Sequence, residues 1–251
     1  FPTRRSSDLL IKVYKVRPEE ILVITFTKYA AWEMKNRTRS ICGPSSYAVT
    51  FGTFHGIYYG ILKWAYRLNQ SNLLSDEEKY RILREILPGI DWDQEPEADE
   101  EKDYLQELAI EIGNVKNNCM DIEEYEPVKY TTEKFRKLYR TYEETKKKYR
   151  KIDFEDMLIQ CRDLFMKRPD ILKKWQEKFQ YILVDEFQDV NQAQYDVVRM
   201  LAAPQDNLFV VGDDDQSVYG FRGAKPGIMK EFMKDYPKAR QILLDVNYRS
   251  S

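Results

Sequence analysis

Two apolar runs that end in acidic residues decide the fold: Tyr181–Asp189 reads Tyr-Ile-Leu-Val-Asp-Glu-Phe-Gln-Asp, and Leu208–Ser217 reads Leu-Phe-Val-Val-Gly-Asp-Asp-Asp-Gln-Ser. Each apolar run is too short for an independent helix and shows no polar alternation. Both runs are therefore predicted to be strands that are buried on both faces of a parallel sheet. Their acidic residues then emerge together at the carboxyl edge of that sheet.

This edge is the place where open α/β sheets bind ligands. The carboxylates of Asp185 and Glu186 are hard oxygen ligands, which suit a magnesium ion that carries a nucleotide phosphate. Gln216 and Ser217, after the second strand, add neutral groups that can orient a water or contact a phosphate. The two strand ends together predict ATPase chemistry.

Composition sets the outer limits. The 251 residues are 43% hydrophobic and 33% charged, with a formal net charge of −2, as in an ordinary globular protein with no global attraction to nucleic acid. The three cysteines have neither CxxC spacing nor an even-numbered framework, so no zinc site or disulfide scaffold is predicted. No apolar stretch is long enough to cross a bilayer and no secretory signal is visible, so we expect a cytoplasmic protein with no membrane partner.

The rest of the chain predicts one α/β domain that a helical region interrupts. Strands are expected at residues 20–25 and 47–54, each followed by a helix, at 28–40 and 57–68. Residues 69–150 contain only helical patterns, near 75–87, 99–116 and 131–150. Strand and helix alternation resumes at residue 151, with helices at 153–166 and 192–202 and a last strand at 241–244. The predicted fold class is α/β, a parallel sheet flanked by helices with an inserted all-helical subdomain.

Three segments indicate contact with nucleic acid or nucleotide. The basic run Lys146–Lys151 could track a phosphate backbone, although charged helix faces are usually only solvated surface. Tyr219 and Phe221 lie with Arg222 on a turn-rich segment, and such rings stack on bases of any sequence. Near the end of the chain, Tyr248–Arg249 offers a ring for a purine and a cation for a transferring phosphoryl group.

In their order along the chain, these segments resemble the motifs of superfamily 1 DNA helicases of the UvrD/PcrA/Rep group. The resemblance begins near Leu9 and extends to the C-terminus. The matching segments are Ile24–Met34, Gly52–His55, Ile152–Asp156, Val184–Asp189, Val211–Ala224 and Asn247–Ser250. The resemblance implies a RecA-like domain (1A, residues 9–68 and 151–251) and an inserted helical domain (1B, residues 69–150).

The resemblance also implies roles for matching residues. Asp185 would hold Mg²⁺, Glu186 would act as general base toward the attacking water, and Gln216 would contact the γ-phosphate of ATP. Tyr248 would stack on adenine and Arg249 would act as an arginine finger. The residues implied to contact single-stranded DNA are Phe26, Thr27, His55, Tyr219, Phe221 and Arg222. The implied partners are single-stranded DNA and junctions of single- and double-stranded DNA, with unwinding from 3′ to 5′.

The chain also departs from the family pattern. Lys28–Tyr29 stands where relatives usually have Asn-Lys, and Phe221 stands where many have Trp. No G-x-x-x-x-G-K-[ST] phosphate loop occurs in the chain. Residues 1–8 resemble nothing in the family, and we expect them to be a foreign segment joined to a truncated reading frame. The chain is therefore expected to be a helicase fragment that alone neither hydrolyses ATP at a useful rate nor unwinds duplex.

Two other functions stay open from the sequence. The chain could be a fragment or degenerate relative that binds single strands without hydrolysis, which salt-sensitive and ATP-independent binding would indicate. Alternatively, Asp185, Glu186 and Asp189 could form a metal-dependent nuclease site. A nuclease usually needs carboxylates from several chain segments, and the sequence shows no second acidic cluster with a nearby lysine.

Overall fold

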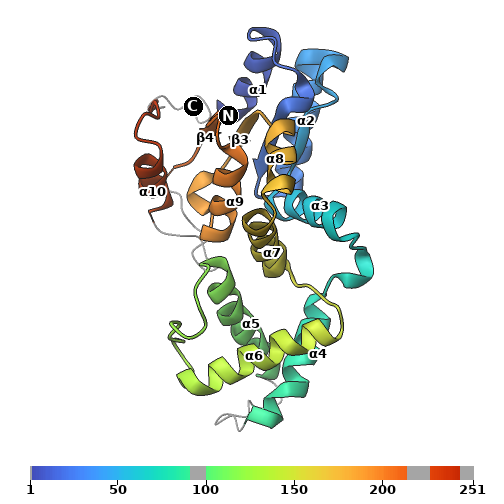
Figure 1. The fold of residues 1–251 in the computed structure, drawn as a ribbon, viewed down its shortest axis with the longest axis vertical. Helices are drawn as coiled ribbons and strands as arrows, with labels where there is room; N and C mark the ends of the chain where they lie inside the picture. The colour runs from blue at the N-terminus through green and yellow to red at the C-terminus, as the bar shows by residue number, and fades with distance from the viewer. Residues whose placement is uncertain (1, 91–99, 214–226, 244–251) are drawn as a thin grey trace.

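The computed structural model of the protein describes residues 2–90, 100–213 and 227–243 (Figure 1). An α/β unit forms the upper part in this view, and a helical unit forms the lower end. The elements, in chain order, are α1 Pro2–Lys12, η1 Pro18–Glu20, β1 Ile21–Thr25, α2 Lys28–Cys42, η2 Gly43–Ser46, β2 Thr50–Thr53, α3 Phe54–Tyr66, η3 Gln70–Asn72, α4 Asp76–Ile86, η4 Leu87–Ile90, α5 Glu101–Asn117, α6 Thr132–Lys148, α7 Phe154–Lys167, α8 Pro169–Lys178, β3 Tyr181–Val184, η5 Phe187–Asp189, α9 Gln192–Ala202, β4 Leu208–Val210 and α10 Ile228–Asp235.

The described strands form a parallel sheet of four strands in the order β2-β1-β3-β4. The strand β1 is buried at every position, because its residues alternate between two hydrophobic cores. Leu22 and Ile24 pack into the core that α3, α7 and α9 form on one face of the sheet. Ile21 and Val23 pack on the other face with Met34 of α2 and residues of α1. The predicted parallel α/β sheet is therefore confirmed.

The strand β4 differs from the prediction. The run from Leu208 was predicted to form a strand that is buried on both faces of the sheet. In the structure β4 pairs only with β3 among the described strands, and Phe209 is 36% exposed. The last predicted strand, at residues 241–244, also differs. Residues 241–243 are not in a strand, and Ile242 and Leu243 are 66% and 81% exposed. Residue 244 lies outside the described residues.

The helical unit has a hydrophobic core of its own. Its helices α4, α5 and α6 pack around Leu83, Leu108 and Leu138, all of which are fully buried. Local signals set where these helices begin: Ser75 caps α4 and accepts from the backbone N–H of Glu78, whose side chain in turn accepts from the N–H of Ser75. The described part of residues 69–150 thus contains helices and no strand.

The two crossings between the units lie side by side. Leu73 and Ile152 form a parallel β-bridge, in which the N–H of Leu74 donates to the carbonyl of Ile152 at 2.8 Å and the N–H of Ile152 donates to that of Asn72 at 2.8 Å. The chain therefore enters and leaves the helical unit through one pair of adjacent segments.

The segment that precedes β1 is part of the folded structure. Pro2–Lys12 forms α1, which packs against α2, and the hydroxyls of Ser7 and Thr38 lie 3.4 Å apart in a buried contact. The expectation that residues 1–8 are foreign stays a prediction. Within the described ranges, no helix combines the length and the apolar character that crossing a membrane requires.

Candidate nucleotide and DNA site at the carboxyl edge of the sheet

The predicted site residues follow the carboxyl ends of adjacent strands. Phe26 and Thr27 follow β1, His55 follows β2, and Asp185 and Glu186 follow β3. The chain goes from β1 to β2 on one side and then returns to β3 on the other side, so the strand order reverses between β1 and β3. Such a switch point is where open α/β sheets form their ligand crevice.

The end of β3 presents one buried and one exposed carboxylate. Asp185 is 5% exposed, and its backbone N–H donates to the carbonyl of Ile24 at 3.0 Å, which extends the pairing of β3 with β1. Glu186 is exposed and has a left-handed backbone, with φ 53° and ψ 45°. A non-glycine residue rarely adopts this conformation, and such strain concentrates at functional sites. These two carboxylates supply the oxygen ligands that Mg²⁺ prefers.

Gln188 links Glu186 to the loop after β4, although no role was predicted for Gln188. Its side-chain amide donates to Oε2 of Glu186 at 2.9 Å, and its Oε1 accepts from the N–H of Asp213 at 3.1 Å. Gly212 makes this approach possible, because a Cβ there would lie 2.7 Å from Oε1 of Gln188 and 3.0 Å from its backbone nitrogen. Gln188 thus holds the carboxylate of Glu186 and is also hydrogen-bonded to the loop that follows β4.

The β1 and β2 ends are aromatic. The rings of Phe26 and Phe54 meet edge to face at 5.5 Å. Thr27 is exposed and also caps α2, where its Oγ1 accepts from the N–H of Ala30 at 3.1 Å. His55 is partly buried, and burial lowers the pKa of its imidazole against the opposing influence of the Glu155 charge. The imidazole is therefore neutral at pH 7.

Phe154 is a further aromatic residue at this edge. It is the first residue of α7, it is 48% exposed, and its ring meets that of His55 edge to face at 5.7 Å. A sequence signal for it existed, since Asp153 and Asp156 form a capping box that marks the start of a helix. That box places the intervening aromatic residue on the first turn, next to water.

Six residues with roles implied by the resemblance lie outside the described ones: Gln216, Tyr219, Phe221, Arg222, Tyr248 and Arg249. Ser217 lies outside them as well. The structure therefore brings together the β1, β2 and β3 parts of the predicted site. The predicted roles of those six residues stay predictions.

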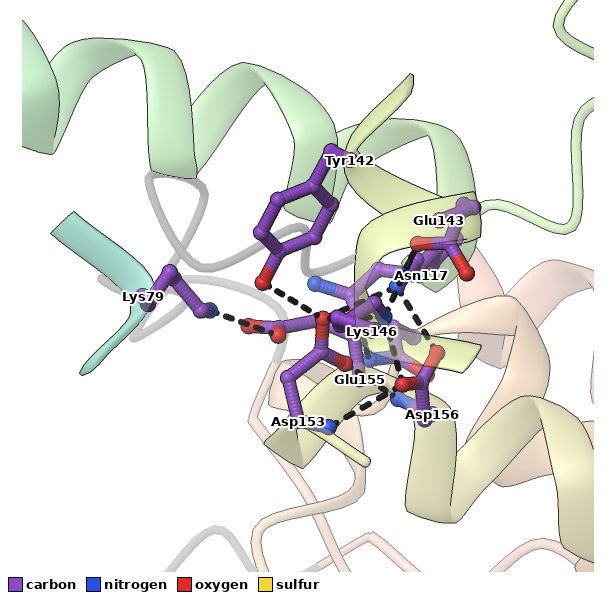
Figure 2. A network of polar contacts seen from close by, with 10 residues as sticks. Lys79, Asn117, Tyr142, Glu143, Lys146, Asp153, Glu155 and Asp156 are labelled. Carbon is purple, nitrogen blue, oxygen red and sulfur yellow. Dashed lines mark hydrogen bonds and ion pairs between the residues drawn. The ribbon is translucent and has the colours of Figure 1, made fainter. Parts of the chain in front are cut away.

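Part of the basic run Lys146–Lys151 pairs with the protein itself, while Lys147, Lys148 and Arg150 are exposed, so a role of this run in tracking a phosphate backbone stays a prediction. Lys146 is 1% exposed, and its Nζ lies 2.7 Å from Oδ2 of Asp153 and 2.5 Å from Oδ2 of Asp156 (Figure 2). Lys151 pairs with Glu78 at 2.8 Å. At least these two lysines neutralise carboxylates of the protein itself, because folding brings acidic residues to them.

A second buried lysine joins the same cluster. Nζ of Lys116 lies 2.6 Å from Glu143, 2.9 Å from Asp153 and 2.7 Å from Asp156. Burial acts to raise the pKa of Asp153, but the charges of Lys116 and Lys146 outweigh it and hold this pKa well below its usual range. The same carboxylates outweigh the effect of burial on Lys116 and raise its pKa well above the ordinary value. Asp153 and Lys116 are thus held in their charged forms, whereas burial raises the pKa of Asp156 against the opposing charge of Lys116.

This network bears on the nuclease alternative. Among the described residues, the acidic side chains close enough to share a metal ion are Glu143, Asp153 and Asp156, and this group does not include Asp185, Glu186 or Asp189. The inference that no acidic cluster lies near a lysine was wrong. However, two lysine ammonium groups already occupy the space among these carboxylates. The geometry therefore does not favour a nuclease site at either place.

The comparison with protein families decides which family this arrangement represents. The model of the UvrD/REP helicase N-terminal domain matches residues 8–237. The chain belongs to the UvrD/Rep helicase family. The UvrD/Rep family match covers both parts of the α/β unit and the helical unit between them.

Similar proteins of known name agree with this family. The chain is 40% identical over 253 residues to YjcD of Bacillus subtilis (strain 168), which carries the provisional name of an ATP-dependent DNA helicase, and the match covers 96% of the chain and 32% of the relative. It is 38% identical over 255 residues to the ATP-dependent DNA helicase PcrA of the same strain, covering 99% and 34%. DNA helicase II of Escherichia coli (strain K12) is 34% identical over 252 residues, covering 96% and 34%. The chain thus spans about a third of the length of these relatives.

Proposed function

We propose that this chain is the first lobe of an ATP-dependent DNA helicase, which binds one single strand along the β1 and β2 ends of its sheet and magnesium–ATP at the β3 end. The observation that carries the proposal is the placement of Asp185 and Glu186 at the switch point of the sheet, in a chain of the UvrD/Rep family. The names of PcrA and DNA helicase II, given to proteins that contain a matching lobe, support it.

The geometry supports a division of labour at the β3 end. Asp185 is buried and held by pairing with β1, so it is the fixed ligand that would hold Mg²⁺. Glu186 is exposed and its carboxylate accepts from Gln188, so it would receive a proton from the attacking water. Magnesium would supply charge stabilisation for the phosphoryl group. Gln216, Tyr248 and Arg249 would complete this site as the family pattern implies.

Single-stranded DNA would lie beside these groups. Phe26, His55 and Phe154 provide ring surface at the β1 and β2 ends, and Thr27 provides a hydroxyl at the start of α2. Base stacking on rings tolerates any sequence, as a translocating motor requires. We propose 3′ to 5′ movement and a preference for junctions from the family resemblance. We also propose that the domains are divided as 9–68 with 151–251, and 69–150.

The strand-binding half of the proposal is tested on the 251-residue protein. Fluorescence anisotropy with a labelled oligothymidylate should show binding that weakens as salt rises. Phe154→Ala should weaken binding at least about five-fold, because a base stack contributes about 1–3 kcal/mol. The matched control is Trp64→Ala, since Trp64 is 52% exposed on α3, packs on Trp175 and lies outside the proposed strand path. Equal affinities of the two variants would contradict the assigned path.

The hydrolysis half is tested separately. The 251-residue protein is expected to release no phosphate from magnesium–ATP above the rate of a Glu186→Gln variant, with or without single-stranded DNA. Release that DNA stimulates and that Glu186→Gln abolishes would show instead that this lobe hydrolyses ATP alone. Strand binding without hydrolysis in every longer form of the protein would favour the binding-only alternative.

A further inference from the structure

Three lysines, one from each α-helix of the helical unit, reach the same helical turn of the α/β unit. They are Lys79 of α4, Lys116 of α5 and Lys146 of α6, and their side chains are 8%, 4% and 1% exposed. Their partners are the carboxylates of the first turn of α7: Nζ of Lys79 lies 3.0 Å from Glu155, and Lys116 and Lys146 each contact Asp153 and Asp156 (Figure 2).

The backbone of this turn is held by the same groups. Oδ1 of Asp153 accepts from the N–H of Asp156 at 2.8 Å, and Oδ2 of Asp156 accepts from the N–H of Asp153 at 3.0 Å. Tyr142 of α6 donates its hydroxyl to Oδ2 of Asp153 at 3.0 Å. The carboxylates that cap α7 are therefore the ones that the lysines bind, so the lysines fix where α7 begins.

The same turn carries Phe154. It lies between the capping residue Asp153 and Glu155, it is exposed, and its ring contacts His55 at the edge of the sheet. The position of that ring depends on the backbone that the carboxylates anchor. The first turn of α7 thus joins the lysines of the helical unit to the aromatic edge of the α/β unit.

We infer that Lys79, Lys116 and Lys146 are positioning residues, which fix the first turn of α7 and so hold Phe154 beside His55 in the geometry that binds the strand. The inference rests on the proposed function and deepens it. It gives the helical unit a role in strand binding that requires no contact with the strand. Removal of Lys116 or Lys146 leaves Asp153 and Asp156 with one lysine counter-charge in place of two, and removal of Lys79 leaves Glu155 without its lysine. In each case the turn relieves the lost charge pairing by moving toward water.

A single histidine, His55, allows the position of the first turn of α7 to be followed by NMR. His55 is the only histidine among the 251 residues, so one imidazole gives one set of carbon and proton signals in NMR spectra of ¹³C-histidine-labelled protein. The signals depend on the ring of Phe154, which lies 5.7 Å away. Spectra are recorded at pH 8, well above the ordinary histidine pKa of 6.5, so that a change in the signals reports geometry rather than protonation.

The variants are Lys146→Met, Lys116→Met and Lys79→Met in the full 251-residue chain. Each should shift the His55 signals and weaken oligothymidylate binding about five-fold or more, the loss expected for one base stack. The matched control is Lys151→Met, because Lys151 pairs at 2.8 Å with Glu78 of α4 and its ion pair does not involve α7. This control should leave the His55 signals and the affinity unchanged.

The outcomes separate the inference from the proposed function. If Lys116→Met and Lys146→Met do not fold, Lys79→Met decides, because its partner Glu155 is 22% exposed and can be hydrated. Folded variants with wild-type His55 signals and wild-type affinity would overturn the inference. Shifted signals in a protein that binds no strand even as wild type would support the positioning of the turn and overturn the proposed strand site.

Discussion

Asp153→Asn tests how much the buried ion network contributes to stability. The Asp153 side chain is 0% exposed, and its Oδ2 accepts from Lys116 at 2.9 Å, Lys146 at 2.7 Å and Tyr142 at 3.0 Å. Asparagine keeps the shape but removes the charge that these two lysines face. Breaking a buried ion pair costs about 3–5 kcal/mol. For a chain of this length the melting temperature should then fall by about 6–20 °C.

A matched control and a second substitution separate the cost of the lost buried charge from that of the lost helix cap. Asp163→Asn is the same chemical change on the same helix, but Asp163 is 43% exposed and pairs with Lys167 at 3.2 Å, so it should cost about 0.3–0.5 kcal/mol. Asp153→Ala also removes the helix cap and should cost about 0.5–2 kcal/mol more than Asp153→Asn. Urea denaturation followed by circular dichroism gives these free energies of unfolding.

The dependence on pH follows from the direction of the pKa shift. The pKa of Asp153 is lower in the folded protein than its ordinary value of 3.8, so the unfolded chain binds the proton first. The contribution of Asp153 is therefore complete above about pH 4 and is lost as the pH falls below it. The reasoning is refuted if Asp153→Asn lowers the free energy of unfolding by less than about 1 kcal/mol at pH 7, as is expected for the exposed control Asp163→Asn.

Three further predictions concern other parts of the molecule. Gly212→Ala should cost about 1–3 kcal/mol in urea denaturation, because its Cβ would lie 3.0 Å from the backbone nitrogen of Gln188; an unchanged midpoint would contradict this contact. NMR titration should give His55 a pKa below 6.5, since burial lowers it, so this residue stabilises the fold above that pH and less as the pH falls; a higher pKa would mean that Glu155 dominates. Ser75→Ala should cost about 0.5–2 kcal/mol and Ser75→Thr less; equal losses would show that the cap of α4 is not the cause.

Local signals were sufficient for much of the fold. The helix predicted at residues 192–202 has the same bounds as α9, and Asn191 caps it through a reciprocal pair with Gln194. The strand ends at Thr25 and Val184 follow from apolar runs that stop at polar residues. Because parallel strands share a carboxyl edge, the grouping of Phe26, His55 and Asp185 at one edge follows from those ends.

Other features depend on contacts between distant residues. Phe209 is partly exposed because β4 pairs only with β3 among the described strands. The residues of β4 alone do not specify which strands lie beside it. Lys146 stands in a basic run that is typical of solvated surface, yet its partners Asp153 and Asp156 and the companion Lys116 come from two other helical segments. Periodicity within one segment contains no information on such convergence.

Three α-helices, α1, α8 and α10, were not predicted. For α8 a signal was present, since Pro169 occupies its first turn and Ile171 and Trp175 are spaced at i and i+4. For α10, the eight residues that begin at Ile228 follow the left-handed Gly227 and are short for a periodic pattern.

The bridge between Leu73 and Ile152 has a consequence for protein engineering. Because the two crossings are adjacent, a short linker between them could replace the whole helical unit without stretching the chain around it. Such an excision would remove the lysines that pair with Asp153 and Asp156, together with the α5 and α6 side chains that contact these carboxylates. A minimal version of the α/β unit would therefore keep both residues, because aspartate is a preferred N-cap and hydrated carboxylates stabilise the N-terminus of a helix. The helical unit is thus separable from the α/β unit in chain connectivity, although its lysines form ion pairs with carboxylates of the α/β unit.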